Sequence, residues 1–513
     1  MGSRHSKIIL NLTGSPRDIS HLANGRFLKA FGAKAGRWTH LSHVFYDTPD
    51  RELETQGITL RLTEGDGEIR QRVTRQSPGA MRIENHMAVL TPGARVFSAT
   101  GSGEIDAAIR DCGALSPVYR ITYDRWRAVI RYRVSKIEVT IDLGEAEVWR
   151  HGRRINRGPV NTLALKMAKG EREDLFDFAR LLTESAGVRL SPQSKRDQAR
   201  ALAAGAQILI GKMPTLSLTG DETAGDVLRA AIGLVAERIT ALPPGAIDGR
   251  DPYALYQLRV ALRRFRAIER TYRPFLTGKK LRRLAKRARI VGKMLGPARD
   301  WDVFIDETIP EITAGGDAPE SLSMLTAAAG GARAAAWADA RDTLNTAEFH
   351  AFLIDLNEYA LAPFKKKDLK GALSKPVRDF APIALDRQRK RAVKTVRRTD
   401  QSTTDGRHRV RLALKKLRYS VQLFKSLYPK EIRSPYMTAM RETQDAYGEL
   451  NDAHCAKELA HEAAAGADAK RAAGFVAGYV SVADHEAAAK TAHFWRRLEA
   501  MTPFWRADDF SVS

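Results

Sequence analysis

Two segments of this chain carry the same row of cationic side chains. The first, Tyr256–Arg266, reads YQLRVALRRFR, and the second, His408–Arg418, reads HRVRLALKKLR, at an offset of 408 − 256 = 152 residues. The register then holds downstream at two further pairs of residues: Gly296 with Gly448, and Asp300 with Asp452. A spacing kept over such a length predicts a duplicated helical unit. What the duplication repeats is positive charge, and a row of positive charge is suited to bind a polyanion.

In each segment the cations share one face of the expected helix. At about 100° per residue, Tyr256, Arg259, Arg263 and Arg266 fall within an arc of about 80°, as do their counterparts in the second copy. An apolar stripe adjoins each arc: Leu255, Leu258, Leu262 and Phe265 in the first copy, Val410, Leu414 and Leu417 in the second. We therefore expect two basic ridges on opposite walls of one groove. A solvated charged face would explain one such helix, but its recurrence in both copies favours a binding groove.

The residues predicted to contact the polyanion are those of the two ridges: Arg259, Arg263, Arg266, His408, Arg411, Lys415 and Arg418. Arg264 and Lys416 point away from the ridge by about 80° on the same wheel and are weaker candidates. Asp300, Asp302 and Asp452 are interpreted as partners that hold neighbouring cations in place, which lowers the ordering cost of binding, and not as catalytic groups.

Composition limits the classes of protein to which the chain can belong. Its 513 residues are 43% hydrophobic, which suits two or three domains with proper cores and excludes a disordered chain. The formal net charge of +24 favours polyphosphate, nucleic acid or an acidic membrane as a partner. The two cysteines, Cys112 and Cys455, make no disulfide framework. No apolar run is expected to reach transmembrane length, and the expected location is the cytoplasm.

The N-terminal third reads as β-structure and the remainder as helix. Up to about residue 170 apolar and polar residues alternate with period two, and the runs Leu60–Leu62 and Ile69–Val73 flank a turn that predicts a hairpin. Helices are expected over Pro16–Phe31 and Glu171–Ala186. From about Pro214 the pattern is helical.

The predicted fold class is therefore α+β. It combines an N-terminal antiparallel β-barrel with flanking helices and an all-α duplicated helical bundle. The predicted domains are residues 1–205 and 221–507, joined by a linker over 206–220.

The C-terminal region, roughly Leu216 to Trp505, resembles a CHAD domain, an all-helical duplicated module that binds inorganic polyphosphate. The stretches that carry the resemblance are Tyr256–Arg266, Leu295–Asp302, His408–Tyr419 and Gln444–Asp452. The family usually has His where the first copy has Tyr256, whereas His408 is kept. The resemblance implies inorganic polyphosphate as the partner, and association with polyphosphate granules as a further expectation.

The N-terminal region, about Ser6 to Leu202, resembles a CYTH domain, the triphosphate-tunnel barrel. The similarity is carried by Tyr46–Asp50, Leu60–Leu62, Arg82–Glu84, Ile137–Gly144 and Ser194–Lys195. The order of the two domains resembles that of bacterial inorganic triphosphatase-like proteins. The resemblance implies a triphosphate-hydrolysing barrel that works with a divalent metal.

The acidic positions that would hold this metal are replaced. The opening Glu-x-Glu-x-Lys strand of the family is matched by Lys7, Ile9 and Asn11, and its late Glu-Leu-Glu-Leu-Glu strand by Thr162–Lys166. Magnesium takes about six oxygen ligands and usually anchors through carboxylates. We therefore predict no catalytic residue, no metal ligand and no cofactor, with magnesium expected only if the barrel is active.

Anion binding in the barrel is a separate expectation. Arg61, Arg82 and Arg125 align with basic positions of the family's tunnel, and Lys195 with a lysine of its C-terminal helix. Arginine can bind phosphate oxygens without a metal, so triphosphate or another organic phosphate is a candidate ligand. The alternative, which stays open, is that these cations form ion pairs with Glu84, Glu138 and Asp142.

The predicted function is polyphosphate binding by the helical ridges, beside a barrel that has lost triphosphatase activity. One alternative is an active triphosphatase with a non-standard metal site. The other is a nucleic-acid-binding protein, which the net charge also fits. Aromatic residues make up only 7% of the chain and do not interleave with the basic ridge, so a base-stacking ladder is not indicated.

Overall fold

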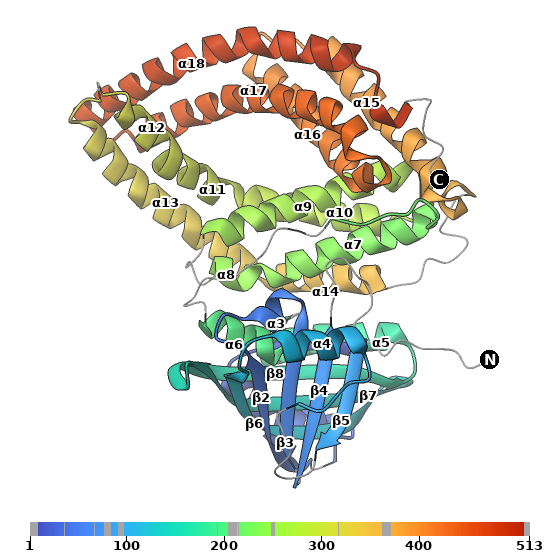
Figure 1. The fold of residues 1–513 in the computed structure, drawn as a ribbon. Helices are drawn as coiled ribbons and strands as arrows, with labels where there is room; N and C mark the ends of the chain where they lie inside the picture. The colour runs from blue at the N-terminus through green and yellow to red at the C-terminus, as the bar shows by residue number, and fades with distance from the viewer. Residues whose placement is uncertain are drawn as a thin grey trace. The chain divides into compact units, whose positions relative to one another are not determined.

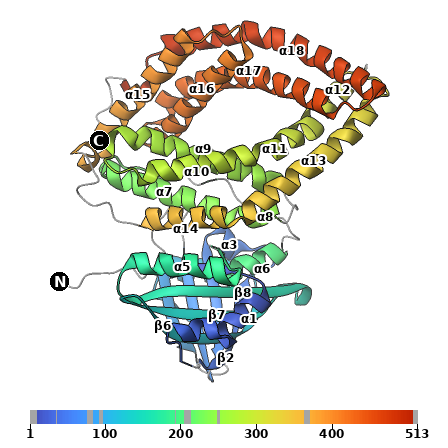
Figure 2. The ribbon, with the colours of Figure 1, turned by 180° about the vertical axis from the view of Figure 1, so that it is seen from behind.

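The computed structural model divides the chain into two compact units. One comprises Met1–Pro214 with His350–Glu358, and the other comprises Thr215–Phe349 with Tyr359–Ser513. The structure describes residues 9–34, 36–65, 67–75, 84–90, 97–191, 193–203, 213, 215–247, 252–316, 318–361 and 371–506. We call the unit that contains Met1–Pro214 the sheet unit, and the unit that contains Thr215–Phe349 the helical unit (Figures 1 and 2).

The sheet unit is built on one antiparallel sheet of nine strands. Their order is β5-β4-β3-β2-β6-β7-β8-β1-β9. The strands are β1 (Ile9–Thr13), β2 (Trp38–Asp47), β3 (Ile58–Gly65), β4 (Glu68–Arg75), β5 (Glu84–Leu90), β6 (Ser116–Tyr132), β7 (Ser135–Arg150), β8 (Arg153–Lys169) and β9 (Arg189–Leu190). The antiparallel fold class is confirmed, but the expected closed barrel is corrected: no hydrogen-bonded pairing among the described strands joins β5 to β9.

The sequence signals for the strands of this unit correspond to the structure. The predicted hairpin is β3–β4, with Arg61 opposite Arg72, and its turn contains Gly67 at a φ of 79°, a conformation that glycine adopts without strain. The late strand keeps its alternation, since Leu163 and Leu165 are fully buried while Thr162 and Lys166 face the opposite side.

Helices complete the two faces of this sheet. They are α1 (Pro16–Asn24), α2 (Arg26–Ala30), α3 (Glu52–Thr55), α4 (Gly103–Asp111), α5 (Arg172–Ala186) and α6 (Lys195–Ala203). The helices expected at residues 16–31 and 171–186 are therefore confirmed. Ala199 of α6 packs into a cluster with Tyr123 and Phe45, whereas Ile105 of α4 packs with Leu60 from the other face of the sheet.

The described part of the helical unit consists of helices, from 5 to 34 residues long. They are α7 (Ala224–Ala241), α8 (Pro243–Ile247), α9 (Pro252–Tyr272), α10 (Lys280–Met294), α11 (Gly296–Val303), α12 (Ile309–Ala314), α13 (Leu322–Asn345), α14 (Ala347–Leu361), α15 (Val377–Arg398), α16 (Thr404–Phe424), α17 (Lys430–Ala463) and α18 (Ala467–Ala500). Residues His350–Glu358 of α14 are the part that groups with the sheet unit.

The internal repeat is reproduced residue by residue in α9 and α16. Both helices have 21 residues, begin and end at positions 152 apart, and continue into a 3-10 turn. The copies then differ, because Pro297 starts a new helix in the first copy, whereas α17 runs unbroken through the matching position. The expected apolar stripes form the core, since Leu258, Phe265 and Leu414 are fully buried.

One apolar stretch corrects an expectation from the sequence. Ala224–Ile247 has a mean hydropathy of 1.2, so by length and composition alone it could cross a membrane. Its Val227, Leu228 and Ile232 are buried in the helical unit, and a core helix passes the same test.

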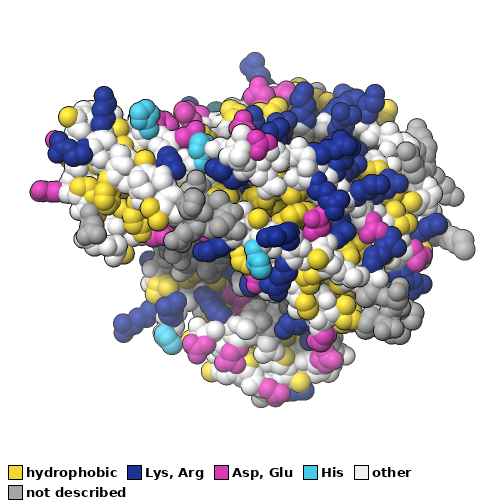
Figure 3. Space-filling view, turned by 90° about the horizontal axis from the view of Figure 1, so that it is seen from above, with side chains coloured by type: hydrophobic (Ala, Val, Ile, Leu, Met, Phe, Trp, Pro, Cys, Tyr) yellow, Lys and Arg dark blue, Asp and Glu magenta, His cyan; other side chains and the backbone are white. Residues whose placement is uncertain are grey.

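The surplus of positive charge is visible on the surface, where Lys and Arg side chains gather over much of the face drawn in Figure 3.

Candidate anion-binding site

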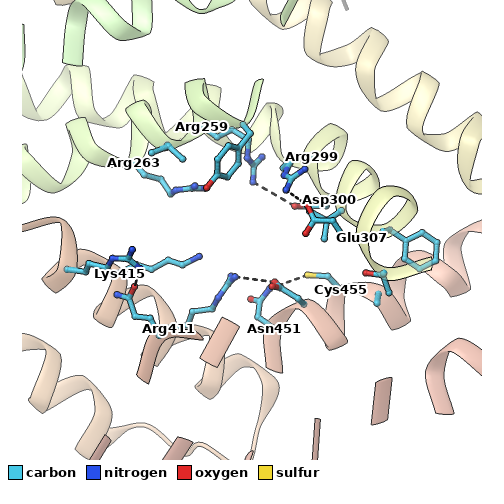
Figure 4. Close-up of a pocket in the computed structure, with 18 of the residues that line it drawn as sticks. Arg259, Arg263, Arg299, Asp300, Glu307, Arg411, Lys415, Asn451 and Cys455 are labelled. Atoms are coloured by element: carbon cyan, nitrogen blue, oxygen red, sulfur yellow. Dashed lines mark hydrogen bonds and ion pairs between the residues drawn. The ribbon is translucent and has the colours of Figure 1, made fainter. Parts of the chain in front are cut away.

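The helical unit contains a pocket of about 440 Å³ between the two repeats. One wall comes from α9 and α11, and the facing wall comes from α16 and α17 (Figure 4). The cationic side chains that line it are Arg259, Arg263, Arg264, Arg299, Arg411, Lys415 and Arg418. The carboxylates that line it are Asp300, Glu307 and Asp452. Seven cations thus face three carboxylates, and the pocket keeps a net positive charge. We call it the repeat pocket.

Each repeat places one arginine of the pocket with one aspartate. Arg259 lies 3.8 Å from Asp300, and Arg411 lies 3.1 Å from Asp452 (nitrogen to oxygen). The two pairs are equivalent under the 152-residue offset. A Cβ atom on Gly296 would stand 3.0 Å from the Arg259 guanidinium, so this glycine makes room for the arginine in the first copy, whereas a Cβ atom on Gly448 would meet nothing within 4 Å. The aspartates therefore hold these guanidinium groups in place, as interpreted from the sequence.

The two walls act on each other electrostatically. Burial raises the pKa of Asp300, and the nearby Asp452 charge adds to the rise, so carboxylates of the two repeats come close. Burial also lowers the pKa of Lys415 to about 7, helped by Arg411 and Arg263 from opposite walls. Charges of one sign have thus been brought together from both repeats.

Several guanidinium nitrogens in the pocket are buried without a partner. The Nε atoms of Arg263, Arg264 and Arg411 have no solvent exposure and no hydrogen-bond acceptor. Such donors are costly to leave unsatisfied, by about 1–3 kcal/mol each. An anion that supplies oxygen atoms to this pocket would satisfy donors that the protein leaves open.

The structure divides the sequence-predicted residues of the ridges. Five of them line the repeat pocket: Arg259, Arg263, Arg411, Lys415 and Arg418. Arg266 and His408 do not line it; the His408 Nδ1 atom lies 2.8 Å from Oδ1 of the pocket residue Asn451. Arg264, a weaker candidate on the helical wheel, does line the pocket.

Sequence reasoning missed the end of the pocket beyond α11. There Arg299 donates to Glu307 at 2.6 Å and lies over the ring of Tyr256, 5.2 Å from its centroid. Glu307 lies in a π-helical turn, Phe304–Thr308, which the periodicity of the sequence does not predict. Arg299 had a signal, because it directly precedes Asp300 in the recurring pattern.

The sheet unit gathers a second group of cations. Arg125 donates to Asp142 at 2.7 and 2.9 Å, and the Lys195 ammonium lies 2.5 Å from the same carboxylate. The pKa of Arg61 is lowered to about 10, first by burial and then by the charges of Arg72 and Arg125. Arg61 therefore lies near these cations. Its Nε atom is buried without an acceptor. Arg82 lies outside the described residues.

The two carboxylates of β7 that face these cations, Asp142 and Glu138, do not fit a magnesium site. Both oxygens of Asp142 already accept from Arg125 or Lys195, and Glu138 is paired with Lys166 at 2.6 Å. No group of three or more potential metal ligands occurs among the residues that the structure describes. Two aspartate or glutamate side chains bound to cations offer no open oxygen set for a hard divalent ion.

Comparisons with known proteins find one family and one curated relative for parts of this chain. The family model of the CHAD domain matches residues 230–461. The inorganic triphosphatase of Haemophilus influenzae is 22% identical over 158 residues, which are 30% of this chain and 44% of that protein. The chain therefore spans less than half the length of this curated relative.

Solved structures resemble each unit separately. The CHAD domain of the plant Ricinus communis is 24% identical with a TM-score of 0.48, covering 57% of this chain and 97% of that one. A putative adenylyl cyclase from Hippeastrum, described as having a dominant triphosphatase activity, is 14% identical with a TM-score of 0.25. That match covers 38% of this chain and 95% of that one.

Proposed function

Because residues 230–461 form a CHAD domain, we propose that the helical unit binds inorganic polyphosphate in the repeat pocket. The observation that carries this proposal is the convergence of seven cations from both repeats on one pocket that holds three carboxylates. Arginine and lysine bind phosphate oxygens by charge-assisted hydrogen bonds, and arginine can do so with two nitrogens at once. A linear phosphate chain supplies both the charge and the closely spaced acceptors that this pocket lacks.

A nucleic acid is a poorer fit to this site. Stacking of bases on aromatic rings supports single-strand binding. Of the aromatic residues that line the pocket, Tyr256 lies under Arg299 and Phe304 is buried, which leaves the ring of Tyr419. Polyphosphate has no bases to place. The cytoplasm, at polyphosphate granules, is the location that this function implies, and it remains part of the proposal.

We further propose that the sheet unit has no magnesium-dependent triphosphatase activity. Metal-assisted phosphoryl transfer needs the ion to neutralise the developing charge, and the side chains of Asp142 and Glu138 are engaged with Arg125, Lys195 and Lys166. The cations Arg61, Arg125 and Lys195, with Arg82, stay proposed ligands for triphosphate or another organic phosphate. The ion-pair alternative accounts for Arg125 and Lys195, whereas no ion pair of Arg61 occurs among the side chains that the structure describes.

The test is calorimetric titration of the full chain with long-chain polyphosphate, with and without magnesium. Released phosphate is measured in the same samples. Arg263→Glu combined with Lys415→Glu should abolish binding, because the two side chains come from opposite walls of the pocket. The matched control is Arg282→Glu with Lys286→Glu, which reverses two exposed cations of α10.

A competition titration with single-stranded DNA completes the test, and four outcomes decide between the proposals. Binding that is lost only in the pocket variant, without phosphate release, supports the proposal. Binding that survives in the pocket variant overturns the site. Phosphate release in magnesium overturns the proposed loss of activity, and stronger competition by single-stranded DNA than by polyphosphate favours the nucleic-acid alternative.

A further inference from the structure

A second group of cations lies in the helical unit outside the repeat pocket. Arg266 and Arg270 stand one turn apart on α9, Arg289 is on α10, and Lys416 is on α16. The charges of Arg270, Arg266 and Arg289 all act on Lys416, whose pKa is lowered to about 8, first by burial and then by these neighbours. Because α9 packs against both α10 and α16, the three helices bring these four side chains to one region of the helical unit. We call them the second cluster.

The internal repeat relates the second cluster to the repeat pocket. Under the 152-residue offset, the pocket residue Arg264 corresponds to Lys416, and the pocket residue Arg418 corresponds to Arg266. The α9 and α16 helices meet near the ends that carry these residues, where the hydroxyls of Thr271 and Ser420 lie 2.8 Å apart. The pair Arg266 and Lys416 is thus the repeat-related copy of the pair Arg418 and Arg264, and it is the pair Arg418 and Arg264 that lines the repeat pocket.

The acidic neighbour of the second cluster is Glu269, whose charge acts on Arg266 and Arg270. Among the described residues, no ion pair joins Arg266, Arg270, Arg289 or Lys416 to a carboxylate. The neighbouring Glu269 is buried and already bound by Arg273, at 2.6 and 2.8 Å. Arg266, Arg270 and Lys416 are half-buried, so water screens their mutual repulsion less than it would at the surface. This arrangement is unfavourable for the fold by itself, and an anion would relieve it.

We propose that the second cluster is a second phosphate subsite, occupied by the same polyphosphate chain that enters the repeat pocket. Arg263 links the two sites, because it lines the pocket and its charge also acts on Arg266. A linear chain of phosphates long enough to leave the pocket finds further cations along α9. A short phosphate fills the pocket and does not reach them. The inference rests on the proposed polyphosphate binding.

The experiment compares two probes on the full chain. The probes are inorganic triphosphate and long-chain polyphosphate, and the variant is Arg270→Gln with Lys416→Gln. Affinity for the long chain should fall about tenfold or more through the loss of charge-assisted contacts, whereas affinity for triphosphate should stay within about twofold. The matched control, Arg282→Gln with Lys286→Gln, removes two exposed cations from α10 and should change neither affinity by more than about twofold. Arg266→Gln tests the same subsite by a single change if the double variant does not fold.

The outcomes separate this inference from the function on which it rests. If the wild-type chain binds both probes and the cluster variant behaves as the α10 control does, the second subsite is wrong and the repeat pocket stands. An equal loss for both probes would also overturn it, because the cluster would then belong to one undivided site. A wild-type chain that binds neither probe removes the proposed function, and this inference with it.

Discussion

Lys415 is half-buried in the repeat pocket, among cations from both walls. Burial, Arg411, Arg263 and Arg259 lower the pKa of its ammonium group to about 7, while Asp452 opposes the shift. A bound polyphosphate favours the charged form, so binding takes up a proton whenever Lys415 is neutral beforehand. By linkage, affinity should be flat below about pH 7 and weaken as pH rises above it, by at most about tenfold per pH unit for one proton.

Titrations with long-chain polyphosphate between pH 6 and 9 check this prediction. Lys415→Arg keeps its charge over this range, so the variant should lose that part of the pH dependence. Comparison of the two proteins cancels any titration of the ligand itself. Equal slopes in the two proteins would show that Lys415 is not the group that takes up the proton.

At the scale of single elements, Asp142 of β7 binds two cations in the interior of the sheet unit, Arg125 and Lys195. Burial would raise the pKa of this carboxyl, but the hydrogen bonds and charges of Arg125 and Lys195 outweigh it and hold the pKa below its usual value. The folded pKa is thus depressed, so the stabilisation is present above the unfolded pKa of about 3.9 and is lost as pH falls through the folded value. At neutral pH it is fully present.

Replacement of this carboxylate should therefore open the sheet unit. Asp142→Asn leaves two half-buried cations without their partner and should lower the free energy of unfolding by about 3 kcal/mol or more. Asp124→Asn, a change on β6 that breaks an exposed contact with His40 of β2, should lower it by less than about 1 kcal/mol. Hydrogen exchange of the β6 and β7 amides measures the opening of this unit in the full chain. Equal protection in the two variants would contradict the prediction.

The sequence predicts single elements of this protein better than their assembly. The equivalence of α9 and α16 follows from the repeat, and the burial of Leu163 and Leu165 follows from alternation, because both are local patterns. Closure of the sheet is a pairing between its two edge strands, on which no local pattern reports. A helical wheel likewise gives the angle of Arg266 but not the neighbouring helix, so it could not assign Arg266 to the second cluster and Arg264 to the pocket.

At the scale of the whole molecule, the net charge of +24 should make polyphosphate binding strongly dependent on salt. Each cation that binds a phosphate releases condensed counterions, and for nucleic-acid backbones the logarithm of affinity falls by about 0.7–0.9 per contact with each logarithmic unit of salt. Arg411→Gln should therefore reduce the slope by about that amount. Arg70→Gln should leave the slope unchanged, since Arg70 is exposed and paired with Glu68 at 2.6 Å. Affinity titrations from low to high sodium chloride measure both slopes.

The repeat of α9 and α16 has a consequence for how a polymer would enter. Facing walls built from two copies of one sequence, with Arg259 and Asp300 on one and Arg411 and Asp452 on the other, present similar chemistry to a chain arriving from either end. A nucleic-acid strand has a 5′ and a 3′ end and would meet such a site in two inequivalent orientations. A linear polyphosphate chain is the same in both directions, so its two orientations in the site are equivalent and it can enter by either end.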